Sequence, residues 1–196
     1  MSHELKVLHQ TPAQTIGPFF HDALMRDGVD DLDPDRNAGR PIIVAGTVLD
    51  GGGTPIDDAM IEIWQSDGQG RYRHPLDHWA ESTPGQFIGF GRVATDLQGG
   101  YRLRSAMPGS VATPDGGLQA PHLNVQIFTR GLLDRLTTRI YFDGNPANAD
   151  DPVLSAADPA RRATLLAVED GEDDGVPCYR FDLRLQGDGE TIFFDI

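Results

Sequence analysis

Short runs in which hydrophobic and polar residues alternate are spread along the chain, separated by turns rich in glycine and proline. The clearest run is residues 178–186, where Tyr179, Phe181, Leu183 and Leu185 alternate with polar side chains. Because neighbouring side chains of a strand point to opposite faces, this run predicts a strand with one face in a core. Similar runs predict further strands at residues 42–49, 60–65, 87–95, 100–104, 137–142 and 190–194 and within residues 118–130.

The connections between these strands are mostly turns, and two are long. Residues 75–86 and 107–121 each combine prolines and glycines with polar residues and predict long loops. Asp158 followed by Pro159 is typical of a helix N-terminus and predicts one helix over residues 160–168. Strands at short intervals with so little helix predict an all-β chain, an antiparallel β-sandwich with long loops and one or two short helices.

Composition narrows the classes of partner. The chain has 30 acidic and 16 basic residues, a formal net charge of −14. This charge opposes binding to nucleic acid or to an anionic membrane surface. The single cysteine, Cys178, cannot form an internal disulfide, and no apolar run is long enough to span a bilayer, so we expect a cytoplasmic protein. The acidic residues 170–175 lack the ligand spacing of a calcium loop and predict a hairpin turn.

The strand within residues 118–130 carries the candidate metal chemistry. His122 and Asn124 are two residues apart, so their side chains share one face of a strand. Two imidazoles at this spacing would be good ligands for iron, zinc or copper, but an asparagine amide is a poor substitute. The residues alone leave three interpretations open: an active site, a damaged active site, or an ordinary strand with one buried histidine.

Several short motifs follow one another in a characteristic order over residues 41–194. They are Ile63-Trp64-Gln65, Gly70-Arg71-Tyr72-Arg73-His74, Gly91-Arg92, Pro108-Gly109, Pro121-His122-Leu123-Asn124 and Tyr179-Arg180-Phe181-Asp182. Together they resemble the intradiol ring-cleaving dioxygenases. Residues 11–18 and 186–195 also match opening and closing motifs of one subunit type in that family. The resemblance implies an intradiol-type β-sandwich over residues 41–196, with residues 1–40 as an N-terminal arm and loop that packs on a partner subunit.

In that family the catalytic subunit binds one ferric ion through two tyrosinates and two histidines, a ligand set that suits Fe(III) and a chelating catechol. The resemblance maps the first tyrosine to Tyr72 and the first histidine to His122. The second tyrosine position is Val111 and the second histidine position is Asn124. Gln119 replaces an arginine that stabilises negative charge in the catalytic subunit. Because coordination needs the full ligand set, we expect a vestigial site with no metal and no catalytic residue in this chain.

The resemblance also implies a partner, a catalytic β subunit that keeps all four ligands, holds the Fe(III), and binds a catechol and O2. Thr15, Gly17 and Pro18 map to a segment that helps to wall the β subunit's substrate pocket. Arg130 maps to an arginine near that pocket, where a guanidinium would attract a substrate carboxylate. Heterodimers of this kind are expected to form a larger assembly.

For the same side chains we also weighed purely structural interpretations. Trp64 is expected in the core from its strand phase, and His122 is expected to be buried and hydrogen-bonded. Tyr72 is expected to be a packed tyrosine with a tethered hydroxyl. An ion pair at the surface or interface competes with substrate steering as the role of Arg130. For Gly17 and Pro18 the alternative is a simple turn.

The sequence therefore predicts a non-catalytic subunit of a ferric ring-cleaving dioxygenase. Two alternatives remain. One is a stand-alone β-sandwich module that binds a small aromatic or a sugar in the former cleft. The other is a self-sufficient dioxygenase with an altered metal site, against which Val111 and Asn124 argue.

Overall fold

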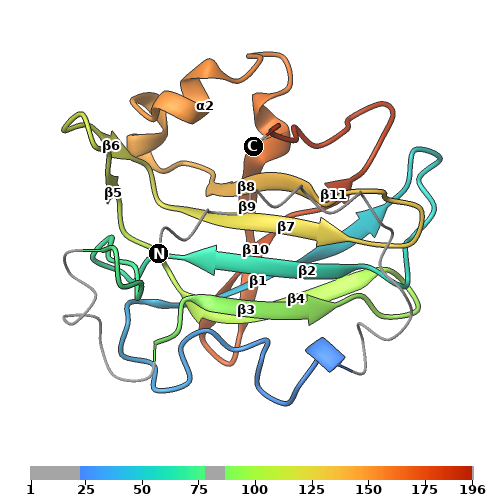
Figure 1. Ribbon diagram of the computed structural model, residues 1–196, viewed down its shortest axis with the longest axis horizontal. Helices are drawn as coiled ribbons and strands as arrows, with labels where there is room; N and C mark the ends of the chain where they lie inside the picture. The colour runs from blue at the N-terminus through green and yellow to red at the C-terminus, as the bar shows by residue number, and fades with distance from the viewer. Residues whose placement is uncertain (1–22, 78–86, 196) are drawn as a thin grey trace, which may run out of the picture.

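The computed structural model describes residues 23–77 and 87–195. The strands are β1 (Pro41–Leu49), β2 (Met60–Gln65), β3 (Phe90–Ala94), β4 (Gly100–Ala106), β5 (Val111–Ala112), β6 (Leu118–Gln119), β7 (His122–Phe128), β8 (Leu136–Phe142), β9 (Leu166–Asp173), β10 (Val176–Arg180) and β11 (Leu183–Arg184). Two layers of strands face each other, one formed by β3, β2, β7 and β8 and the other by β4, β1, β10 and β9 (Figure 1). The predicted all-β sandwich is confirmed.

Alternation of side chains decides which face of each strand enters the core. In β2, Ile61 and Ile63 are buried, whereas Glu62 and Trp64 lie on the opposite face. Gln65 continues the inward phase as a fully buried polar residue. Its side chain donates to the carbonyl of Ala106 at 2.8 Å and accepts from Ser105 Oγ at 2.7 Å, so burial leaves no polar group of the amide unpaired.

The strand order is β11-β1-β10-β9-β8-β7-β2-β3, with β4 also paired to β1. Most neighbours are antiparallel, as predicted, but β1 is parallel to both β10 and β11, and β8 is parallel to β9. The β8–β9 contact is short, with Tyr141 opposite Leu166 and Phe142 opposite Ala167. This short junction joins the two layers, which then close over a shared core.

The core lies between the layers and draws on both. The first layer contributes the inward side chains of β2, β7 and β8, and the second those of β1, β4 and β10. The buried members include Ile61, Ile63, Leu123, Val125, Ile127 and Ile140 from one layer and Ile42, Val44, Leu103 and Tyr179 from the other. Residues 23–40 contribute Leu32, which is fully buried in the same cluster. This part of the predicted N-terminal arm therefore packs on the chain's own sandwich, while the division at residue 40 stays a prediction.

The predicted helix over residues 160–168 is wrong. Arg162–Leu165 form one turn of 3-10 helix, and β9 begins at Leu166. The short α-helix is instead α2 (Pro152–Ala156), whose N-cap Asp151 accepts hydrogen bonds from the backbone N–H groups of Val153 and Leu154. An Asp-Pro pair marks both places, and the one at 151–152 begins the α-helix because its carboxylate is fully buried among several donors.

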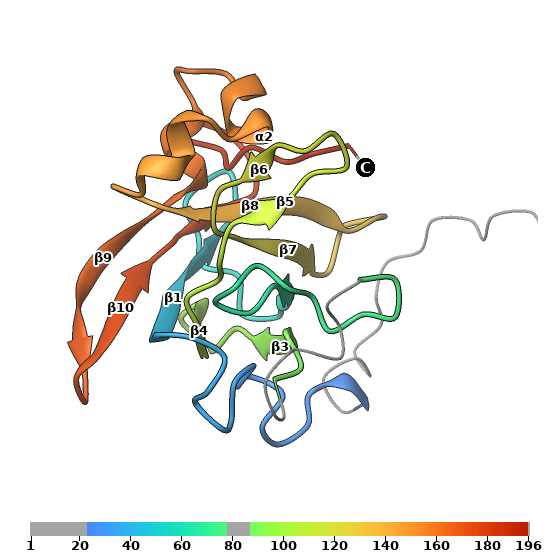
Figure 2. The ribbon, with the colours of Figure 1, turned by 90° about the vertical axis from the view of Figure 1, so that its left-hand side faces the viewer.

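The C-terminal strands are confirmed only in part. Tyr179, Phe181 and Leu183 are buried as the alternation predicts, but the run is divided between β10 and β11. Residues 190–194 form no strand, so the predicted hairpin there is wrong. The acidic turn is confirmed, since β9 and β10 form an antiparallel hairpin through Asp174 and Gly175, both with positive φ (Figure 2).

Within residues 23–77 and 87–195, no helix is long and apolar enough to cross a membrane.

Candidate functional site

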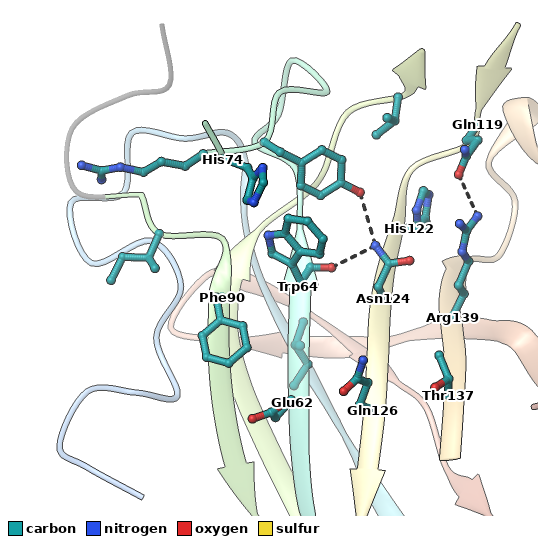
Figure 3. Close-up of a pocket in the computed structure, with 15 residues that line it drawn as sticks. Glu62, Trp64, His74, Phe90, Gln119, His122, Asn124, Gln126, Thr137 and Arg139 are labelled. Carbon is teal, nitrogen blue, oxygen red and sulfur yellow. Dashed lines mark hydrogen bonds between the residues drawn. The ribbon is translucent and has the colours of Figure 1, made fainter. Parts of the chain in front are cut away.

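A cavity of about 700 Å³ lies on the outer face of the layer formed by β3, β2, β7 and β8. Strand register places four of its side chains in one row across this face. Phe90 is opposite Trp64, Trp64 is opposite Asn124, and Asn124 is opposite Arg139. Figure 3 shows the row running from an aromatic end at Phe90 and Trp64 to a guanidinium at Arg139. The non-core face of the sheet is therefore the floor of the cavity.

His122 is the first residue of β7 and is 2% exposed, which confirms that it is buried. Its Nδ1 lies 2.7 Å from the carbonyl oxygen of Ala120. Burial and, secondly, the positive charge of Arg139 lower the pKa of His122 to about 4. The ring is therefore neutral near pH 7. Because a carbonyl oxygen can only accept, Nδ1 carries the proton, and Nε2 is left as the acceptor on a ring that lines the cavity.

Tyr72 and Asn124 are hydrogen-bonded to each other. Asn124 Nδ2 lies 3.3 Å from the Tyr72 hydroxyl and 3.3 Å from the carbonyl oxygen of Trp64. Burial raises the pKa of Tyr72, and the hydrogen bond from Asn124 only partly opposes this. The hydroxyl is therefore a neutral phenol, tethered as the sequence predicts.

Val111 and Gln119 line the cavity from the two-residue strands β5 and β6, where they are paired in register. Gln119 Oε1 accepts a hydrogen bond of 2.7 Å from Arg139 Nη1. The structure thus brings all five positions of the predicted former metal site to one cavity, namely Tyr72, Val111, Gln119, His122 and Asn124.

A buried carboxylate fixes the strand that leads into His122. Asp151 accepts from the backbone N–H of Ala120 at 2.8 Å and from the Tyr141 hydroxyl at 3.1 Å. Tyr141 lies opposite His122 in the β7–β8 register, with ring centroids 5.6 Å apart. The N-cap of α2 therefore also positions the imidazole.

The side chains at this cavity do not fit a ferric ion. Fe(III) in a tyrosinate site needs anionic phenolates and several imidazoles, whereas here one neutral phenol and one imidazole face a valine and an amide. The amide N–H group of Asn124 points at the phenol oxygen and occupies it. Among the described residues, no group of three or more His, Cys, Asp or Glu side chains could hold a metal ion.

Trp64 was predicted in the core, and the structure corrects this. It lies on the outer face of β2 and is 41% exposed, because the core phase of that strand belongs to Ile61 and Ile63. Its ring contacts Tyr72 at 4.9 Å and His74 at 5.9 Å between centroids. Together the three rings form an aromatic wall of the cavity.

Several cavity residues were missed by the sequence reasoning, among them Arg139 and Phe90. A signal for Arg139 was present, because it is a charged residue inside an otherwise apolar and threonine-rich strand. The sequence alone does not give the register between β7 and β8, which places Arg139 beside Asn124.

Arg130 lies away from the cavity. It follows β7 at the end opposite His122, roughly 26 Å along the strand at ~3.3 Å per residue. The side chain is 76% exposed and pairs with Asp58 through Nε and with Asp57 Oδ1 at 3.5 Å. Burial works to raise the pKa of Asp58, but hydrogen bonds from Thr129 and Arg130 outweigh it and lower that pKa. Thr15, Gly17 and Pro18, the other predicted pocket residues, lie outside the described residues.

Comparison with known proteins gives a consistent result. A family model described as "Dioxygenase" matches residues 16–187. The protocatechuate 3,4-dioxygenase alpha chain of Burkholderia cepacia is 39% identical over 98% of this chain and 100% of its own length. The beta chain of the same enzyme from that organism is 32% identical over 91% of this chain and 77% of its own length.

The fold is similar to solved ring-cleaving enzymes. The crystal structure of catechol 1,2-dioxygenase from Pseudomonas arvilla C-1 matches with a TM-score of 0.63 and 26% identity, over 80% of this chain and 55% of that one.

Proposed function

The chain belongs to the intradiol ring-cleaving dioxygenase family, and from that premise we propose that it is the non-catalytic α subunit of a protocatechuate 3,4-dioxygenase. In this proposal the β subunit holds Fe(III) and uses O2 to cleave protocatechuate to 3-carboxy-cis,cis-muconate, a step of aromatic catabolism in the β-ketoadipate pathway. The α chain shapes the β subunit's pocket and stabilises the complex. Relatives of both kinds, an alpha and a beta chain, support a two-subunit enzyme.

The observation that carries the proposal is the chemistry of the cavity. Only Tyr72 and His122 keep side chains of the expected ligand types, and burial keeps the Tyr72 hydroxyl, which accepts a hydrogen bond from Asn124, in its neutral form. A chain without a competent ligand set has to act through a subunit that has one. This supports a structural and pocket-forming role for the chain.

In the complex, Arg130 and the segment with Thr15, Gly17 and Pro18 contribute to the partner's substrate pocket. The exposure of Arg130 supports this assignment, because the guanidinium can reach a partner surface. Its ion pairs with Asp57 and Asp58 hold it at that end of β7. A carboxylated substrate would then compete with these aspartates for the guanidinium.

The test is to purify the full chain alone and after co-expression with a candidate β subunit. Iron content, tyrosinate-to-iron absorption in the visible range, and protocatechuate-dependent O2 uptake are measured on both samples. We expect iron, colour and activity only in the complex. An isolated chain that is iron-loaded and active would overturn the proposal, and so would failure to form a stable complex with any dioxygenase β subunit.

A further inference from the structure

The cavity on the outer face of the sheet retains the features of a ligand pocket even though its side chains do not fit iron. Its volume of about 700 Å³ lies within the range of ~300–1,000 Å³ that is typical of small-molecule sites. Its walls are mostly apolar and aromatic, with a few polar groups that converge from β7 and β8. These features raise the question of which ligand the polar groups would select.

The cation is the first selective element. Arg139 is half-buried at the floor of the cavity and has no carboxylate within ion-pairing distance among the described residues, although the chain carries a net charge of −14. In the described part of the chain its hydrogen bonds run only from Nη1, to Gln119 at 2.7 Å and to the Tyr141 hydroxyl at 3.2 Å. The N–H groups on Nε and Nη2 therefore remain for a ligand. A half-buried guanidinium of this kind favours a carboxylate, which it can bind through two parallel hydrogen bonds.

Among the described residues that line the cavity, no acid cancels this charge. Glu62 is the acidic side chain among the described lining residues, and it forms an ion pair with Arg92 at 2.7 Å. Gln119, the nearest partner of Arg139, is neutral and orients the guanidinium without neutralising it. The floor of the cavity is therefore positive.

The aromatic wall is the second selective element. The rings of Trp64 and His74 lie together at the other side of the floor (Figure 3), and the ring of Tyr72 packs on Trp64. Trp64 and Arg139 are two strands apart in one row, a span of roughly 10 Å at ~4.8 Å per strand. A single aromatic ring fits this span, with its face or edge on Trp64 and a carboxylate toward Arg139.

Two acceptors lie between the wall and the cation. His122 offers Nε2, because its Nδ1 donates to Ala120. Asn124 offers Oδ1, because its described hydrogen bonds all run from Nδ2. Both groups would accept a hydrogen bond from a hydroxyl on the bound ring. An anion with a donating hydroxyl and an aromatic body would therefore pair with Arg139 and with one of these two acceptors.

We infer that this cavity is a binding site for a small aromatic carboxylate that carries a ring hydroxyl, a ligand of the hydroxybenzoate class. The carboxylate pairs with Arg139, the ring packs on Trp64 and Tyr72, and the hydroxyl donates to His122 or Asn124. The ligand is bound and not transformed. The site belongs to this chain alone, so it goes beyond the role proposed in the dioxygenase complex.

The test is isothermal titration calorimetry on the full chain without a β subunit and without iron. One probe is 3-hydroxybenzoate, whose hydroxyl lies to one side of the ring and not opposite the carboxylate. The matched probe is 3-hydroxybenzyl alcohol, which keeps the ring and the hydroxyl but has no charge. We expect saturable binding of 3-hydroxybenzoate at one site per chain. Arg139→Gln is expected to weaken it at least tenfold and to change binding of the alcohol by less than twofold. Arg139→Lys keeps the charge and should recover part of the affinity.

Arg161→Gln is the matched control, since it removes an arginine that pairs with Glu190 outside the cavity, and it should bind both probes like the parent chain. Thermal unfolding of each variant verifies folding. Absence of saturable binding by the parent chain would overturn the inference, and so would equal losses for both probes in Arg139→Gln. Because no iron or partner takes part, failure here leaves the proposed complex untouched, and failure of the complex leaves this result standing.

Discussion

Asn124 donates a hydrogen bond from Nδ2 to the hydroxyl of Tyr72 at 3.3 Å, so two positions of the expected ligand set are bonded to each other. The amide occupies the phenol oxygen that a metal would need, and burial raises the pKa of the phenol. Loss of the second imidazole therefore does more than remove one ligand. The asparagine in its place also occupies the oxygen of the remaining tyrosine, which burial keeps in its neutral form.

Restoring the two missing ligands should restore metal binding. We expect the double variant Val111→Tyr, Asn124→His to bind about one ferric ion per chain and to absorb in the visible range through tyrosinate-to-iron charge transfer. Both positions line the same cavity as Tyr72 and His122, and its volume leaves room for the larger side chains. Iron analysis and visible spectra measure the gain.

The matched control for iron binding is Val111→Phe, Asn124→His, which adds equal bulk without a second phenolate and should bind much less iron. Equal iron loading in the parent chain and the double variant would contradict the interpretation of a vestigial site.

The sequence predicted the sandwich because hydrophobic alternation needs only local information. It also predicted that His122 and Asn124 share a face, since a period of two fixes this within one strand. It failed for Trp64, because alternation within a strand does not say which face meets the core. It missed Arg139 for a related reason, as cross-strand neighbours depend on register between segments far apart in the chain. The helix predicted at residues 160–168 failed because an N-cap signal does not determine whether the chain continues as a helix.

Acid should destabilise the chain through His122. Its pKa is 6.5 when unperturbed and about 4 in the fold. Between these values the unfolded state binds a proton that the native state does not, so the free energy of unfolding falls as pH decreases and the effect is complete below pH 4. The full effect is roughly 3 kcal/mol at ~1.36 kcal/mol for each tenfold change in proton affinity. Urea unfolding of the parent chain and His122→Asn from pH 7 to pH 4 measures it.

The comparison with His122→Asn is made as a difference at each pH, so that the titration of carboxylates common to both proteins cancels. The parent chain should lose more stability than the variant over this window, even if the variant is less stable at pH 7. Identical pH dependence in the two proteins would show that His122 is not held neutral by the fold.

In the proposed complex, Arg130→Ala should weaken binding of protocatechuate more than binding of catechol, which lacks the carboxylate. We expect the KM for protocatechuate to rise about tenfold, because a charge-assisted contact to carboxylate is lost, and the KM for catechol to change little. Oxygen-uptake kinetics of the complex with each substrate measure the difference. Arg135→Ala is a control on the same connection, since that arginine pairs with Asp134. Equal effects on both substrates would contradict a contact between Arg130 and the substrate carboxylate. The role of Arg130 would then be limited to its ion pairs with Asp57 and Asp58.

Gly46→Ala should be among the most destabilising single substitutions in the chain. Gly46 lies in β1, next to the segment that connects β10 to β11. A Cβ added at Gly46 would lie 1.8 Å from the carbonyl oxygen of Phe181 in that segment. That carbonyl is fixed, since it accepts from the Tyr101 hydroxyl at 2.6 Å, and the backbone N–H of Phe181 donates to Ala45 at 2.8 Å. The clash can be relieved only by breaking these hydrogen bonds between Phe181 and its neighbours. We therefore expect a loss of about 3 kcal/mol or more in the free energy of unfolding.

Gly52→Ala is the matched control for Gly46→Ala, because its added Cβ would come no closer than 3.4 Å to any neighbour, the flexible carboxylate of Asp50. We expect it to change the free energy of unfolding by less than about 0.5 kcal/mol. Chemical denaturation midpoints of the two variants and the parent chain measure both effects. If the two variants were equally stable, the close crossing of β1 with the segment after β10 would be wrong. The parallel pairing of β1 with both β10 and β11 depends on that crossing.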